Sequence, residues 1–196
     1  WSRFKQASDQ AYEPCKAYFS AKSGLKQANL ETRKTICDQL GTFLDNADWN
    51  NIDWKAAERI HQTAREEWKA AWPVEFRDNR PVQKRFDDLL KQLEAPLDTE
   101  RKKNEALKQG IVERAEALIE HEPLGDAMSQ AKALQTEWTS IGITRHREDR
   151  KLWQAFRKAC DQIFARRDAR KNEQEQLSRE ADEKAGPVLE ACQSAG

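Results

Sequence analysis

Two Trp–Phe pairs stand 70 residues apart in this chain, in similar surroundings. Trp68 is followed by Phe86 after a charged segment, and Trp138 is followed by Phe156 in the same way. A single amphipathic helix cannot bury its apolar stripe alone, so repeated helical units stack on their neighbours. We therefore expect an all-α fold: an elongated array of antiparallel helix hairpins or three-helix bundles, built from a repeat of about 70 residues with long connecting helices.

The apolar stripe is clearest in residues 152–171, where apolar side chains recur at the spacing of an amphipathic helix. We expect the strongest core contacts where Trp68 meets Phe86 and where Trp138 meets Phe156. The aromatic residues that we assign to the core are Trp54, Trp68, Phe86, Trp138, Trp153, Phe156 and Phe164.

The repeat suggests three divisions of the chain. Residues 1–45 would be the tail of a preceding repeat and a connecting helix, 46–121 the middle repeat and its connecting helix, and 122–196 the last repeat with a long charged C-terminal helix. The chain begins inside one copy of the repeat, without a Met, so we expect a fragment of a longer protein. Helix breaks or kinks are expected at Pro14, Pro96 and Gly186-Pro187.

Composition narrows the partners and the compartment. The formal net charge is zero, which gives no general case for nucleic acid or an anionic membrane as partner, and no apolar run is long enough to span a bilayer. The four cysteines (Cys15, Cys37, Cys160 and Cys192) are widely spaced and form no CxxC motif. They are typical of reduced thiols in a cytoplasmic protein.

Motifs that carry catalysis are missing from the sequence. It has no Gly-rich phosphate loop, no G-x-S-x-G elbow and no H-E-x-x-H. His61 lies on an inward helix face, where a structural role is expected, and His121 and His146 are not spaced for a metal. Adjacent acidic residues do not converge on one point of a helix. We expect no enzyme activity, no cofactor, no metal and no small-molecule substrate.

Basic residues gather in one stretch, which we call the basic ladder. Residues 145–171 hold ten Lys and Arg residues and four Asp and Glu residues. The ladder could contact the phosphates of RNA, or it could be a solvated face paired with its acidic neighbours. The positions of Asp149, Asp161 and Asp168 would distinguish these alternatives. The ladder consists of Arg145, Arg147, Arg150, Lys151, Arg157, Lys158, Arg166, Arg167, Arg170 and Lys171.

Two tryptophans lie in or beside predicted turns rather than on an apolar stripe. Trp49 and Trp72 are candidates for exposed contact with a partner, or for lids over the ends of the helix hairpins.

The last unit resembles the bacterial domain-of-unknown-function family 349. Residues 125–171 match its pattern well and residues 55–103 more loosely, with Trp72 and Gln83 replacing a glycine and a tryptophan. The resemblance implies tandem all-helical domains in a bacterial cytoplasmic protein and no established activity. The pattern is carried by Ala131, Leu134, Gln135, Trp138, Ile141, Gly142, Leu152, Trp153, Phe156, Arg157, Cys160, Asp161, Phe164, Arg166 and Arg167.

Two hypotheses about function follow. The first is a non-enzymatic helical scaffold that binds a protein partner of unknown identity through the charged connections Glu75–Arg80 and Thr144–Arg150 and the last helix. The alternative is a module that binds RNA, the ribosome or another nucleic acid through the basic ladder.

Overall fold

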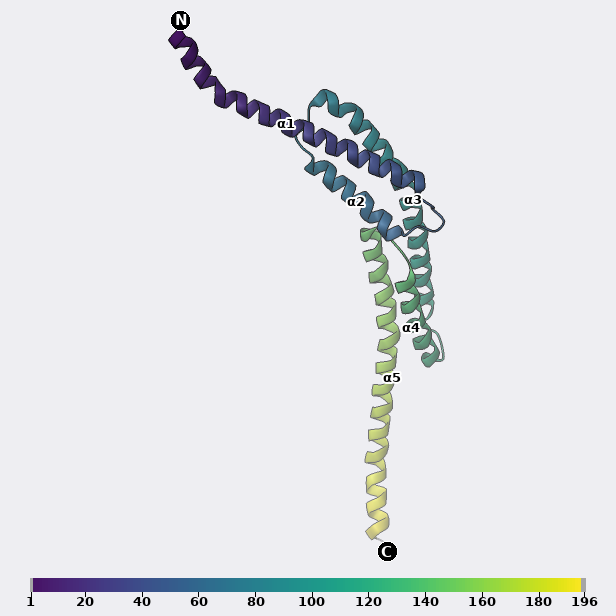
Figure 1. The fold of residues 1–196 in the computed structure, drawn as a ribbon. Coiled ribbons are helices and arrows are strands. Elements are labelled where there is room, and N and C mark those ends of the chain that lie inside the picture. The colour runs from purple at the N-terminus through teal and green to yellow at the C-terminus, as the bar shows by residue number, and fades with distance from the viewer. Residues whose placement is uncertain (1, 195–196) are drawn as a thin grey trace. The chain divides into compact units, whose positions relative to one another are not determined.

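The computed structural model describes the backbone of residues 2–194 and the side chains of residues 2–3 and 5–185. Our expectations for Trp1, Phe4 and Cys192 therefore lie outside the described side chains. Within the described range the chain forms five helices and no strand, which confirms the all-α prediction. The helices are α1 (Ser2–Asn46), α2 (Trp54–Ala70), α3 (Phe76–Ala117), α4 (Leu124–Ser140) and α5 (His146–Ser194), as Figure 1 shows.

The contacts divide the chain into two units. Unit 1 contains residues 1–100 and unit 2 contains residues 101–196. The long helix α3 contributes its first part to unit 1 and its second part to unit 2. Each unit therefore combines the end of one long helix, a short helix and the start of the next long helix.

Unit 1 is built from the second half of α1, the short helix α2 and the first part of α3 (Figure 1). Its core contains the predicted contact between Trp68 and Phe86, whose rings are stacked with centroids 3.9 Å apart and planes inclined by 7°. The first half of α1 extends beyond this core, and residues 5–25 are all exposed. The other buried apolar residues are Leu30, Ile36, Cys37, Leu40, Ala57, Ala64, Ala71, Val74, Leu93 and Leu97.

Unit 2 repeats this core with α4 and the first part of α5. The rings of Trp138 and Phe156 are stacked, with centroids 5.1 Å apart and planes inclined by 10°. Phe164 packs against the core and is partly buried. Trp153 differs from the prediction: its side chain is 43% exposed, because it lies at the edge of the stack with its ring 5.5 Å from that of Trp138.

At the three positions where breaks or kinks are predicted, the helices continue without a break. Pro14 lies inside α1, Pro96 inside α3, and α5 continues through Gly186-Pro187. A proline removes one helical N–H and displaces the carbonyl four residues earlier. Those carbonyls belong to Gln10, Gln92 and Glu183, which are all exposed, so water can satisfy them. The helices therefore continue where the lost hydrogen bond faces solvent.

The turn between α1 and α2 is closed by aromatic side chains. The ring of Trp49 lies 6.4 Å from that of Phe43 and 6.0 Å from that of Trp54. Trp49 and Trp54 are both partly buried, so Trp49 covers the end of this hairpin rather than standing free. Asp53 caps α2 as its sequence position indicates, because its carboxylate accepts a hydrogen bond from the backbone N–H of Ala56 at 3.0 Å.

Candidate interaction surface

Each unit has a short connection between its short helix and the next long helix. The first connection is residues 71–75 and the second is residues 141–145. Both are shorter than the charged connections predicted from the sequence, since α3 begins at Phe76 and α5 at His146. The predicted segments Glu75–Arg80 and Thr144–Arg150 therefore lie mostly in the first turns of these helices.

Polar side chains from the middle of α1 hold the first connection. Asn29 donates a hydrogen bond to the carbonyl of Pro73 at 2.9 Å, and Lys26 pairs with Glu75 at 2.6 Å. Arg33, only 4% exposed, donates to the carbonyl of Ala71 at 2.8 Å. Carbonyls that the turn leaves without helical partners are thereby satisfied, which fixes the backbone of the connection.

Arg33 also joins this connection to the start of α3. Its guanidinium donates to Asn79 Oδ1 at 2.5 Å and to the carbonyl of Trp68 at 3.2 Å, and it lies 4.5 Å from the centre of the Trp68 ring. Burial lowers the pKa of the Arg33 guanidinium from its ordinary value. This cation is thus part of the core, held by carbonyls and an aromatic face.

Unit 2 repeats the arrangement with different residues. Asn104 donates to the carbonyl of Ile143 at 2.8 Å, and Lys108, 6% exposed, pairs with Asp149. The ammonium of Lys108 lies 4.8 Å from the centre of the Trp138 ring. We call Asn29 with Arg33, and Asn104 with Lys108, the polar clasps of units 1 and 2.

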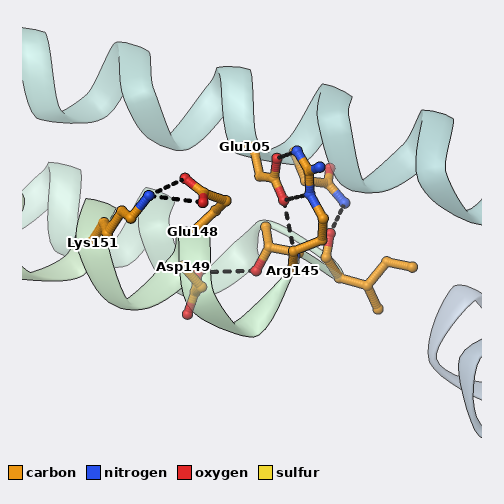
Figure 2. Close-up of polar contacts among 8 residues, drawn as sticks. Glu105, Arg145, Glu148, Asp149 and Lys151 are labelled. Carbon is orange, nitrogen blue, oxygen red and sulfur yellow. Dashed lines mark hydrogen bonds and ion pairs between the residues drawn. The ribbon is translucent and has the colours of Figure 1, made fainter.

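Two further contacts of the second connection are shown in Figure 2. The backbone N–H and the guanidinium Nε of Arg145 both donate to Glu105 Oε1 at 2.9 Å. Thr144 donates to Asp149 at 3.0 Å. Gly142 leaves room for the clasp, because a Cβ there would lie 3.1 Å from Asn104 Nδ2, a tight contact. The second connection is therefore held by side chains of both α3 and α5.

Sequence reasoning overlooked the clasps because it assigned polar residues to the surface. A signal was present: Asn29 and Arg33 are followed 75 residues later by Asn104 and Lys108. An Asn and a cation one helical turn apart, repeated in the long helix of both units, could have been recognised as part of the repeat.

Most of the basic ladder is paired with carboxylates. Arg166 and Arg170 both bind Glu122, and Arg166 also donates to the carbonyls of Ile119 at 2.5 Å and His121 at 3.1 Å. The hydrogen bond from Arg170 lowers the pKa of the Glu122 carboxyl from its ordinary value, and the nearby Arg166 charge acts in the same direction. These two arginines tie α5 to the turn before α4.

Other members of the ladder pair along α5 or with α3. The pairs are Arg145–Glu105, Lys151–Glu148 (Figure 2), Arg157–Asp161, Arg167–Asp168 and Lys171–Glu175. Among the described residues, only Arg147, Arg150 and Lys158 of the ladder form no ion pair. Asp161 and Asp168 therefore pair with basic side chains of the ladder, whereas Asp149 pairs with Lys108 of α3.

Large apolar side chains are exposed beside the first connection. Trp72 is 64% exposed and Phe76, the first residue of α3, is 80% exposed. The ring of Trp72 lies 5.7 Å from the guanidinium of Arg33, so the clasp lies directly beneath it. Gly142 and His146 occupy the corresponding positions of unit 2, so the exposed aromatic pair belongs to unit 1 alone.

The histidines have structural neighbours. His61 Nε2 lies 3.1 Å from Glu94 and is largely buried, as its inward position predicted. His121 lies 2.9 Å from Asp126, and this hydrogen bond lowers the pKa of the Asp126 carboxyl. Within the described residues, no three His, Cys, Asp or Glu side chains are grouped to hold a metal ion. In the same part of the chain, no helix has the length and apolar character needed to cross a bilayer.

Comparison with known proteins places the repeat in a family. Residues 1–77 and 80–146 each match one family, so each matched copy contains a long helix, a short helix and the connection that follows. The division expected from the sequence (1–45, 46–121 and 122–196) places the short helix at the start of a unit, whereas each matched copy starts with the long helix. No curated protein and no solved structure matches the chain. With two tandem copies over most of its length, the chain belongs to the family described as Domain of Unknown Function (DUF349).

Proposed function

We propose that this chain is a non-enzymatic helical scaffold of the bacterial cytoplasm that binds another protein through Trp72 and Phe76. The observation that carries the proposal is that two large aromatic side chains are exposed on a backbone fixed from below by a buried polar clasp. Exposed apolar surface of this kind costs solubility unless a partner uses it.

The energetics of binding favour such a site. Tryptophan is among the residues that contribute most at protein interfaces, especially where it enters a pocket of the partner. A backbone that is already fixed loses little conformational entropy on binding. Asn29 and Arg33 hold the carbonyls on both sides of Trp72, so the backbone that carries this side chain is ordered before a partner arrives.

The buried polar groups support a structural role rather than a catalytic one. Arg33, Asn104 and Lys108 each bind a carbonyl or a neighbouring side chain of the same unit. The free thiols of Cys37 and Cys160 lie in the two cores, which suits a reducing compartment such as the cytoplasm.

The alternative, binding of RNA or another nucleic acid, depends on the cations that remain unpaired. Arg147, Arg150 and Lys158 are three such cations. Three phosphate contacts to a single strand would give a slope of log affinity against log salt of about −2. Fluorescence anisotropy with single-stranded and hairpin RNA at several salt concentrations measures this slope. Binding that weakens with salt at about this slope would favour the nucleic-acid alternative.

The proposal is tested by capture from a bacterial extract with the full chain as bait. The Trp72→Ser/Phe76→Ser variant should lose the proteins that the unchanged chain retains. Leu107→Ser and Leu177→Ser are matched controls, because both leucines are exposed apolar residues elsewhere on the surface. The proposal is overturned if the Trp72/Phe76 variant retains the same proteins as the unchanged chain.

A further inference from the structure

A groove runs along unit 1 between α1 and α2. Ile36, Leu40 and Ala64 form a buried apolar floor, with Phe43 and Ile60 beside them. The groove continues toward the other end of the two helices, where Ala28 and Ala71 line it. It therefore follows several turns of both helices and has the form of a seat for a further helix.

One rim of the groove has a symmetric order of residues. Ala56, Arg59, Thr63, Glu67 and Ala70 line it and share one face of α2, because they are spaced by three or four residues. The order is the same on both sides of Thr63, except that a cation stands on one side and a carboxylate on the other. Within the described residues, neither Arg59 nor Glu67 forms an ion pair.

This order is complementary to itself when the helix is reversed. If a second α2 lies antiparallel with Thr63 opposite Thr63, then Arg59 faces Glu67 of the second copy and Glu67 faces Arg59. Ala56 then faces Ala70, and both are small enough for close helix contact. A contact in which each copy offers the same surface is the isologous interface of two-fold symmetric dimers.

We propose that a second copy of this chain docks its α2 antiparallel in the groove between α1 and α2, forming a two-fold symmetric dimer. The driving force comes from Phe43 and Ile60 beside the floor, because these side chains are only partly buried in one copy and docking removes them from water. The α1 wall presents uncharged Thr35 and Gln39 at the middle of the groove, so Arg59 and Glu67 decide the register.

Unit 2 lacks these features at the corresponding positions. Glu137 of α4 corresponds to Glu67 of α2. Glu137 forms an ion pair with Arg114 of α3 at 2.8 Å, and this pair links the two helices that correspond to the two walls of the groove in unit 1. Ser129 stands where unit 1 has Arg59, so a reversed α4 would offer no cation to Glu137. The dimer interface therefore belongs to α2 and not to α4.

The first test is sedimentation equilibrium of the full chain over a wide range of protein concentration. The unchanged chain should form a reversible dimer. Arg59→Glu or Glu67→Arg places like charges opposite each other twice and should weaken the dimer about tenfold or more. The Arg59→Glu/Glu67→Arg double variant restores opposite charges and should recover dimerisation. A monomer at all concentrations, or a dimer indifferent to both single changes, overturns the proposal.

The second test places a thiol on the proposed axis. In a background with Cys15 and Cys192 replaced by serine, Thr63→Cys should form a disulfide between copies under mild oxidation. Ala133→Cys, the corresponding exposed position of α4, is the matched control and should not. Equal cross-linking of both variants would contradict the α2 interface. Circular dichroism confirms that the variants remain helical.

This inference deepens the proposed scaffold function by naming a second copy as one partner, and it uses a different face of unit 1. Changes at Arg59 and Glu67 test the dimer, whereas changes at Trp72 and Phe76 test capture of other proteins. Each can therefore fail while the other holds.

Discussion

Lys108 of α3 donates a hydrogen bond to Asp149 of α5, in the place where unit 1 joins Arg33 to Asn79. Unit 2 thus uses an ion pair where unit 1 uses a cation and a neutral amide. Each cation lies over the ring of a core tryptophan: Arg33 over Trp68 in unit 1, and Lys108 over Trp138 in unit 2. The two repeats therefore keep the same contact between helices while changing its chemistry.

Removing the acidic partner of this pair should destabilise unit 2. Asp149→Ala leaves the ammonium of Lys108 without its carboxylate. Because the Asp149 side chain is 38% exposed, water reaches this site, and we expect a loss of about 1–3 kcal/mol in the free energy of unfolding. The Lys108→Met/Asp149→Ala double variant removes the buried charge as well and should recover most of this loss. Chemical denaturation followed by circular dichroism measures both. A double variant as unstable as the single one would show that the ion pair is not the cause.

The two aromatic neighbours of Trp138 should differ in importance. Phe156→Ala opens a cavity in the buried core and should cost about 3–5 kcal/mol. Trp153→Ala should cost clearly less, because much of that side chain is already in water. The same denaturation experiment compares them. Equal losses of stability in the two variants would show that Trp153 belongs to the core, as the sequence pattern predicts.

The thiols should react at very different rates. Burial raises the pKa of the Cys37 and Cys160 thiols, so both carry little thiolate and are sheltered from reagents, whereas Cys15 is exposed. In a Cys192→Ser variant, a colorimetric thiol reagent should titrate one cysteine rapidly in the native protein and all three after denaturation. Rapid reaction of all three cysteines in the native protein would contradict the burial of Cys37 and Cys160 in the two cores.

The contact of Glu122 with Arg166 and Arg170 should weaken in acid. Because the pKa of Glu122 is lowered in the folded chain, its contribution to stability is complete above the unfolded pKa of about 4.3 and is lost as the pH falls through the lowered value. NMR titration should place the Glu122 pKa below its ordinary value, and Arg170→Gln should raise it. An unchanged pKa in the Arg170→Gln variant would contradict the assignment of this cause.

The core aromatic residues could be predicted from the sequence, because their spacing along the chain shows which helix face is apolar. Trp68, Phe86, Trp138 and Phe156 recur at helical spacing and at one fixed offset, and stacking of such residues follows from burial of large rings. The all-α fold followed from the same pattern. The continuity of α1 through Pro14 could not be predicted, since it depends on whether the displaced carbonyl faces water.

The polar contacts could not be read in the same way. Glu122 lies more than 40 residues from both arginines that it binds, and no local pattern joins them. The sequence left open whether the basic ladder is free or paired, because it does not say which carboxylates lie beside the ladder in space. Arg33 and Lys108 are buried, and no local sequence pattern distinguishes them from the many exposed Lys and Arg residues of the chain.

The central claim is that the chain works through Trp72 and Phe76 rather than through the basic ladder. The most direct measurement compares two variants in one capture experiment on nuclease-treated bacterial extract: Trp72→Ser/Phe76→Ser and Arg147→Ser/Arg150→Ser/Lys158→Ser. We predict that the retained proteins survive nuclease treatment, are lost with the first variant and are kept by the second. Retention that disappears with nuclease, or that is lost only with the second variant, would contradict this account.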